Sequence, residues 1–390
     1  MTLRGRWVET GNGLNIEIDD AGIVSGVSPY SAQDNEPYLA PGFFDIQVNG
    51  YRGSDYSSES LSGEEVLQIR DYLSMTGTTR HIPTIISNSQ NRILRNLKVL
   101  KDAVSRYPNL AYSIPAVHLE GPYVSGEDGP RGAHDRSFVR EPSIEEYVQW
   151  KEASGGLLKM VTIAPERKGA MEFIRHLTKD GTLVAIGHTG ADPATIRQAV
   201  SNGARLSTHL GNGSHAVIPR LKNYIWEQLA ADELSAGLIA DGFHLPPSVL
   251  KVFYRAKGPE NTILVSDVGP MGGQEPGEYK WGAINVEVHP DGHLGLAGTD
   301  FLAGAGHLLD RGIAQFVNAT GCSLAAAIKL CTLNPAKLLA LPGTPEGREL
   351  PFPQRGEMAN LIRFSFSFGD SRITLHDTVL GNQIKEINSV

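Results

Sequence analysis

Short apolar runs rich in β-branched residues alternate with amphipathic stretches of helical length along most of this chain. Eight runs predict strands, at residues 43–48, 79–84, 114–119, 159–164, 183–187, 205–208, 236–240 and 262–266. Helix-start signals stand between them: Ser62 and Ser143 each precede a glutamate by three residues, as in a capping box, and Asp192 stands before Pro193. Strands that alternate with helices in this way predict a (β/α)8 TIM-like barrel, with a doubly wound open sheet as the alternative.

The two ends of the chain have a different pattern. Residues 3–28 and 359–388 alternate polar and apolar side chains and are broken by turn signals such as Gly11-Asn12-Gly13. Neither end has enough strands to be stable alone, so we predict that both termini pair into one small β-sandwich. The predicted boundaries assign residues 1–41 and 347–390 to this small domain and residues 42–346 to the barrel.

Composition narrows the class of protein. The chain has 41% hydrophobic and 20% charged residues, as an ordinary globular protein has, and its net charge of −8 disfavours nucleic acid as a partner. Its first residues have no apolar stretch of the signal-peptide kind, and no run approaches the roughly 18 residues that cross a bilayer.

Cys322 and Cys331 stand in an Ala/Leu-rich stretch that we interpret as helix, and we predict buried thiols in a reducing compartment. We expect a cytoplasmic protein without a membrane partner.

Candidate chemistry gathers at the ends of the predicted strands, which meet at one mouth in a barrel. These positions carry Asp45, Gln47, Asn49, Thr84, Glu120, Glu166, His188, His209, Asp241, His244 and Asp267. Glu120, His188 and His209 are of the types that bind one Zn²⁺ or Fe²⁺ and leave a position open for water, whose proton Asp267 could take. A lone histidine or aspartate at a strand end is more often structural. Four of them on four strands favour metal-assisted hydrolysis.

Seven motifs in order resemble those of the N-acetylglucosamine-6-phosphate deacetylases, a family of the amidohydrolase superfamily. They are Pro41-Gly42-Phe43-Phe44-Asp45, His118-Leu119-Glu120-Gly121-Pro122, Gly187-His188-Thr189, Thr208-His209-Leu210, Ile239-Ala240-Asp241-Gly242-Phe243-His244, Leu264-Val265-Ser266-Asp267 and Leu296-Ala297-Gly298-Thr299. The resemblance covers about residues 40–360. It implies a metal-dependent amidohydrolase of amino sugar catabolism, which converts N-acetylglucosamine 6-phosphate to glucosamine 6-phosphate and acetate.

The resemblance also implies roles for residues of the catalytic centre. Glu120, His188 and His209 would hold one divalent metal per chain, with Zn²⁺ expected first and Fe²⁺ second. Asp267 matches the catalytic acid and base of the family. His134, in Arg131-Gly132-Ala133-His134, matches a histidine that helps to polarise the acetyl carbonyl.

Substrate-binding residues follow from the same resemblance. Asn212 and the backbone at Gly213 match the loop that contacts phosphate, and His244 matches a histidine near the sugar and the phosphate. Arg220, eleven residues beyond His209, falls where an arginine reaches the substrate phosphate of a neighbouring subunit. The resemblance therefore implies a homodimer.

Two segments depart from the common patterns. Gln47-Val48-Asn49 stands where many amidohydrolases carry His-x-His for a second metal, and neutral amides favour a one-metal site. The loop 211–215 carries Gly213 and Ser214 where the family has Ala and Met, which leaves N-acetylgalactosamine 6-phosphate as an alternative substrate. His215 in this loop either bonds a substrate phosphate or hydroxyl, or is an exposed loop residue.

Other function classes have less support. An amidohydrolase for another N-acyl or cyclic amide would have no evident use for the phosphate-binding set of Asn212, Arg220 and His244. A non-catalytic metal-binding barrel would not need an acid or base such as Asp267. The glycine-containing stretches 271–273 and 303–306 lack Walker spacing, so we interpret them as loops over the barrel mouth rather than as a nucleotide site.

Overall fold

A parallel eight-stranded barrel forms the centre of the protein. The computed structural model describes residues 1–282, 284–299, 301–342, 344, 346–347 and 349–387. The sheet has the order β14-β13-β12-β11-β10-β9-β8-β5. Its strands are β5 (Phe43–Val48), β8 (Thr78–Ile86), β9 (Val117–Glu120), β10 (Leu158–Ile163), β11 (Leu183–Ile186), β12 (Leu206–Ser207), β13 (Ser235–Ile239) and β14 (Thr262–Val265). All eight predicted strands are confirmed. The least accurate prediction is that for 114–119, because Pro115 has no N–H for the ladder and the strand begins only at Val117.

Two backbone hydrogen bonds bring the ends of β5 and β14 together. Asp267 N donates to Gln47 O at 3.0 Å, and Asn49 N donates to Val268 O at 2.9 Å. The sheet is therefore nearly closed, and the open doubly wound alternative is excluded. The same bonds place three polar residues of the strand ends beside one another.

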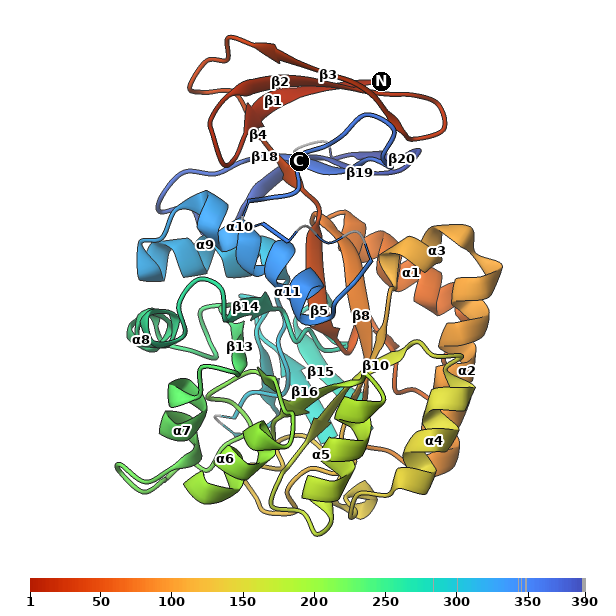
Figure 1. The fold of residues 1–390 in the computed structure, drawn as a ribbon, viewed down its shortest axis with the longest axis vertical. Coiled ribbons are helices and arrows are strands. Elements are labelled where there is room, and N and C mark those ends of the chain that lie inside the picture. The colour runs from red at the N-terminus through yellow and green to blue at the C-terminus, as the bar shows by residue number, and fades with distance from the viewer. Residues whose placement is uncertain (283, 300, 343, 345, 348, 388–390) are drawn as a thin grey trace.

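Helices surround the barrel (Figure 1). They are α1 (Gly63–Ser74), α2 (Gln90–Arg106), α3 (Pro108–Ser113), α4 (Ile144–Ala153), α5 (Ala170–Lys179), α6 (Pro193–Ser201), α7 (Tyr224–Ala230), α8 (Pro247–Lys257), α9 (Leu309–Thr320), α10 (Leu324–Leu330) and α11 (Leu333–Leu338), with a short 3₁₀ turn at Arg136–Phe138. Their apolar faces and the outward-facing strand residues form the core between the two layers.

All three predicted helix starts are confirmed, and one of the two predicted capping boxes is incomplete. Ser62 forms the complete capping box of α1, and the Asp192 side chain accepts from Thr195 N at the start of α6. Ser143 caps α4, but Glu146 does not return the bond. Its carboxylate instead accepts from the Arg140 Nε at 2.9 Å, because a charged donor offers a stronger hydrogen bond than the cap N–H.

Both termini build one further sheet, as Figure 1 shows at the top of the molecule. Its order is β20-β19-β18-β4-β1-β2-β3. The strands are β1 (Thr2–Trp7), β2 (Gly13–Ile18), β3 (Val24–Tyr30), β4 (Tyr38–Pro41), β18 (Asn360–Ser365), β19 (Thr374–Leu380) and β20 (Gln383–Glu386). β4 joins the halves, since it pairs with β1 on one side and with β18 on the other. The predicted small β-domain is confirmed, with its two layers part of one hydrogen-bonded sheet. Its boundaries stay predictions, and residues 388–390 of the predicted range lie outside the described residues.

A small antiparallel sheet after β14 was not predicted. It consists of β15 (Gly277–Trp281), β16 (Ile284–Val288) and β17 (Leu294–Leu296), and a β6 (Gly50–Tyr51) and β7 (Ser54–Asp55) ribbon lies after β5. Trp281 ties the two insertions together by donating from Nε1 to Asp55 Oδ2 at 3.1 Å.

Both cysteines are free thiols outside helix interiors: Cys331 is buried at the end of α10, and half-buried Cys322 precedes that helix. Within the described part of the chain, every helix is too short or too polar to cross a membrane.

Candidate metal centre and active site

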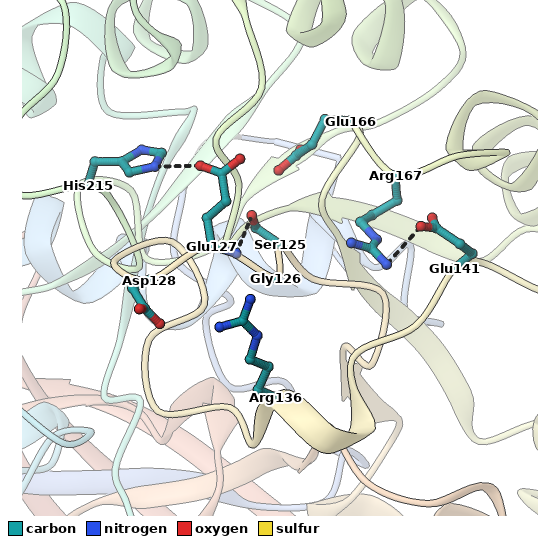
Figure 2. A pocket seen from close by; sticks show the side chains of 9 residues that line it. All are labelled: Ser125, Gly126, Glu127, Asp128, Arg136, Glu141, Glu166, Arg167 and His215. Carbon is teal, nitrogen blue, oxygen red and sulfur yellow. Dashed lines mark hydrogen bonds and ion pairs between the residues drawn. The ribbon is translucent and has the colours of Figure 1, made fainter.

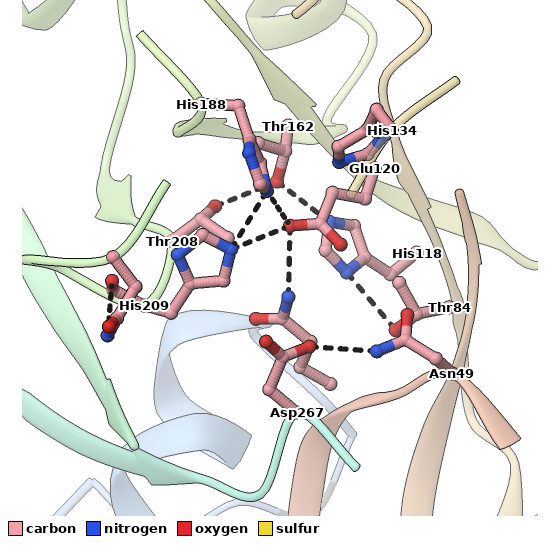
Figure 3. A network of polar contacts seen from close by, with 12 residues as sticks. Asn49, Thr84, His118, Glu120, His134, Thr162, His188, Thr208, His209 and Asp267 are labelled. Carbon is pink, nitrogen blue, oxygen red and sulfur yellow. Dashed lines mark hydrogen bonds and ion pairs between the residues drawn. The ribbon is translucent and has the colours of Figure 1, made fainter. Parts of the chain in front are cut away.

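Glu120, His188 and His209 converge at the carboxyl ends of β9, β11 and β12 (Figure 3). Glu120 Oε1 lies 3.1 Å from His188 Nε2 and 3.0 Å from His209 Nε2, and the two nitrogens lie 3.0 Å apart. All three side chains are buried. Lone pairs that approach this closely repel one another unless a cation lies among them, so the donor set fits a divalent metal.

The electrostatics of this cluster also favour a cation. Burial opposes the charge on Glu120, but the neighbouring imidazoles of His188 and His209 outweigh this effect and hold the pKa of Glu120 well below its usual range. Burial likewise opposes the charge on His209, yet the Glu120 carboxylate raises the pKa of His209 to about 9. A buried carboxylate that stays ionised at neutral pH provides the negative charge that a metal cation needs.

The orientation of His188 is fixed from outside the cluster. Its Nδ1 lies 2.9 Å from the carbonyl of Pro130, an acceptor, so the ring carries its proton there and its Nε2 lone pair faces Glu120. Gly132 and Gly213 lie against the ring: a Cβ would be 3.1 Å from His188 Cε1 at position 132 and 2.7 Å from Nδ1 at position 213. Gly213, where the resemblance led us to expect alanine, therefore lets the 211–215 loop approach the imidazole.

Backbone strain gathers at this site. Five described residues other than glycine have positive φ, and three of them are His188 (50°), His209 (27°) and Asp267 (52°). Such conformations cost on the order of 1–3 kcal/mol each and persist only where the surroundings hold them. Each of these three residues lies just beyond the end of a strand. The positive φ turns the backbone there and brings the three side chains into the mouth of the barrel.

Asp267 lies beside the cluster and is held by Asn49, whose Nδ2 donates to Asp267 Oδ1 at 2.8 Å. Burial raises the pKa of Asp267 to about 6, which suits a group that takes and returns a proton near neutral pH. Gln47 Nε2 donates to Glu120 Oε1 at 3.0 Å. The two amides at the end of β5 therefore orient the carboxylates of the neighbouring residues, and they do not offer the donor atoms of a second metal site.

His134 comes from the long loop after β9, and its ring packs edge-on against His188 at 4.3 Å between centroids. One nitrogen of His134, one of His188 and an oxygen of Glu120 lie within 4.8 Å of one another, so proximity alone would also allow His134 as a ligand. The backbone N–H of Ser87, however, points at His134 Nδ1 from 3.4 Å, which makes Nδ1 an acceptor and leaves the proton on Nε2. His134 is thus a hydrogen-bond donor, and His209 is the better ligand. Burial lowers the pKa of His134 to about 3, so the ring is neutral.

The residues that the sequence assigns to phosphate binding lie in three segments of the chain. Asn212 and Gly213 lie in the loop after His209, with Asn212 Nδ2 donating to His209 O at 3.3 Å. His244 follows β13, and Asp241 Oδ2 accepts from its Nδ1 at 2.8 Å. Burial acts against that carboxylate, but the His244 hydrogen bond and charge lower the pKa of Asp241 to about 2. Arg220 is exposed on the loop before α7, and its backbone carbonyl accepts from Trp226 Nε1 at 3.1 Å.

His215 is not the exposed loop residue of one predicted interpretation, and its predicted bond to the substrate stays a prediction. It is half-buried and contacts the loop after β9 and the start of α7: Nε2 lies 2.9 Å from Glu127 Oε2, and Nδ1 lies 3.1 Å from Tyr224 OH. Its side chain lines a cavity of about 540 Å³, which Glu166 also lines (Figure 2). Glu166 accepts from Thr189 Oγ1 and Gly190 N at 2.5 and 2.8 Å, so it holds the residues that follow His188.

Sequence reasoning missed the residues that orient the site rather than form it. Pro130 acts through a backbone carbonyl, and Ser87 acts through its N–H and its hydroxyl, which lies 2.8 Å from His134 Nδ1. No motif marks such contacts. Ser87 alone had a usable signal, since it directly follows an apolar strand, as the predicted site residues do.

No protein-family model matches the chain. The N-acetylglucosamine-6-phosphate deacetylase of Bacillus subtilis is 32% identical over 80% of this chain and 79% of its own length. The bovine enzyme of the same name is 36% identical over 78% of this chain and 75% of its own length.

Solved structures agree with these relatives. A mutant N-acetyl-D-glucosamine-6-phosphate deacetylase from Mycobacterium smegmatis, in complex with N-acetyl-D-glucosamine-6-phosphate, superposes with a TM-score of 0.82 at 25% identity, covering 98% of this chain and 97% of that one. The enzyme from Thermotoga maritima gives 0.81 at 25% identity over 98% and 99%. A dihydroorotase at 11% identity and a TM-score of 0.55 shares the fold alone. The chain belongs to the N-acetylglucosamine-6-phosphate deacetylase family.

Proposed function

We propose that the protein hydrolyses the acetamide of N-acetylglucosamine 6-phosphate to glucosamine 6-phosphate and acetate. The observation that carries this proposal is the buried Glu120, His188 and His209 cluster with Asp267 beside it, in a chain of this deacetylase family. The activity is the hydrolysis of a linear amide in amino sugar catabolism.

Each residue of the cluster has a defined task in this reaction. Glu120, His188 and His209 hold a divalent metal, which when bound acts as a Lewis acid toward the acetamide carbonyl and makes water more acidic. Asp267 takes the proton of the attacking water and then gives it to the departing nitrogen. His134 donates from Nε2 toward the carbonyl oxygen as negative charge develops there.

A single Zn²⁺ per chain fits the donor set best, with Fe²⁺ as the second choice, because two imidazole nitrogens and one carboxylate oxygen suit both ions. We expect fully active protein to contain about one tightly bound transition metal per chain, since Gln47 and Asn49 serve as hydrogen-bond donors to Glu120 and Asp267. Elemental analysis of active enzyme checks the number. Two metals per chain at full activity would contradict the one-metal site.

The substrate is identified by acetate release over a panel of N-acetylglucosamine, N-acetylgalactosamine and N-acetylmannosamine, each with and without the 6-phosphate. We expect the 6-phosphate of N-acetylglucosamine to have the highest kcat/KM and its unphosphorylated form to be poor, because Asn212, Gly213, Arg220 and His244 are the proposed phosphate and sugar contacts. A higher kcat/KM for N-acetylgalactosamine 6-phosphate would mean that the altered 211–215 loop selects that sugar. Equal rates with and without phosphate would contradict the proposal.

The active species is proposed to be a homodimer in which Arg220 reaches the partner's substrate phosphate. The side chains on either side of it support an interface at this loop, since Val217 is 89% exposed and Leu221 is 77% exposed. Apolar side chains grouped in this way are typical of a surface that another subunit covers.

The cytoplasm is the proposed location, because both cysteines are free thiols, as in a reducing compartment.

A further inference from the structure

Four buried side chains form a continuous hydrogen-bonded chain across the barrel interior, drawn in Figure 3 beside the metal cluster. Thr208 Oγ1 lies 2.8 Å from Thr162 Oγ1, which lies 2.8 Å from His118 Nε2. On the other side of the ring, His118 Nδ1 lies 3.3 Å from Thr84 Oγ1. His118, Thr84 and Thr162 are fully buried, and Thr208 is 4% exposed. We call these four residues the threonine–histidine chain.

One direction of donation satisfies every proton in this chain. Thr208 donates to Thr162, Thr162 donates to His118 Nε2, His118 Nδ1–H donates to Thr84, and Thr84 donates to the carbonyl of Ile82 at 3.4 Å. Thr84 also accepts from Val48 N at 3.2 Å. If every donor and acceptor were reversed, the hydroxyl hydrogen of Thr208 would have no acceptor among the described residues. The imidazole is therefore a neutral link whose two nitrogens are both used.

The threonine–histidine chain lies next to all three candidate metal ligands. Thr162 is the ladder partner of Glu120 across β9 and β10, and His118 is on the same face of β9 two residues earlier. Thr208 directly precedes His209. A Cβ on Gly187, the residue before His188, would lie 2.7 Å from Thr208 Cβ and 2.8 Å from Thr162 Cγ2.

We propose that the threonine–histidine chain positions the metal ligands and thereby sets the affinity for the metal. Hydrogen bonds between buried groups are strong, and their loss leaves unsatisfied donors and acceptors, so β8, β9, β10 and the end of β12 are held in one arrangement. Glu120 and the strained residues His188 and His209 extend from that layer. The proposal rests on the metal site of the proposed function, and it does not depend on which sugar is the substrate.

The test compares Thr162→Val, which keeps the shape and removes the hydroxyl, with Thr162→Ser, which keeps the hydroxyl. Zn²⁺ affinity of the full-length protein is measured by competition with a chromophoric chelator, without any sugar. We expect Thr162→Val to raise the Kd for Zn²⁺ by about 10- to 100-fold, as loss of ligand-orienting contacts does elsewhere, and Thr162→Ser to stay within about 3-fold of wild type.

Thr262→Val is the matched control, because it removes a buried threonine hydroxyl at the start of β14, where Oγ1 donates to Gly258 O at 2.8 Å. It should leave Zn²⁺ affinity unchanged. Wild-type affinity in Thr162→Val, or equal losses in the Val and Ser variants, would overturn the proposal. Thr208→Val provides the same comparison if Thr162→Val does not fold. A protein that shows this Zn²⁺ pattern yet releases no acetate would refute the proposed function and leave the positioning role intact.

Discussion

Asp267→Asn should lower kcat by about 10²- to 10⁴-fold, the usual contribution of a general acid and base. Asparagine cannot take the proton of water, nor return it to the departing nitrogen. Its carbonyl oxygen can still accept the hydrogen bond that Asn49 gives to Asp267 at 2.8 Å, so the local packing is kept. Steady-state kinetics with the phosphorylated sugar measures the change.

Metal content and substrate affinity separate this role from a structural one. The converging metal ligands are Glu120, His188 and His209, and Asp267 is not one of them. The variant should therefore retain about one metal per chain and a KM near that of wild type. A variant that kept more than about a tenth of wild-type kcat would remove Asp267 from proton transfer. Loss of the metal together with kcat would instead make Asp267 a ligand.

The barrel and its ligand set could be predicted because they depend on local signals. Apolar runs of strand length mark the eight strands, and the barrel topology then brings the strand ends together. That is sufficient to group Glu120, His188 and His209, which lie up to 89 residues apart in the chain. Helix caps such as Ser62 could be predicted for the same reason, since a cap involves only neighbouring residues.

What the sequence did not predict depends on contacts without a local pattern. Pro130 holds His188 through a backbone carbonyl, and any residue could supply that group. Glu146 fits a capping box in sequence, but Arg140 takes its carboxylate. The β15–β17 sheet lies in a segment rich in glycine, where loop and hairpin signals overlap. In each case the competing partner is visible only in three dimensions.

Arg220→Ala should raise the KM for the phosphorylated sugar strongly, by an amount equal to about 2 to 5 kcal/mol of transition-state binding. A guanidinium fork is suited to a phosphate dianion, and its loss leaves that charge unpaired. Turnover of the unphosphorylated sugar, which is poor already, should barely change. Lys222→Ala removes a neighbouring exposed cation and is the matched control. If Arg220 only pairs with a surface carboxylate, its loss would cost under about 1 kcal/mol and would not depend on the phosphate.

Mixing Arg220→Ala chains with Asp267→Asn chains tests whether the arginine acts across the interface. In a heterodimer, the chain with an intact Asp267 would receive Arg220 from its partner, so one of the two sites is complete. The other site lacks both groups. Random exchange at equal amounts should therefore restore about a quarter of all sites, because half of the dimers are then mixed. Exchange is followed with differently tagged chains. Recovery would show that the site is built from two subunits, since neither parent dimer contains a complete one. Activity that stays at the level of the parents despite exchange would place Arg220 within its own chain's site or away from the phosphate.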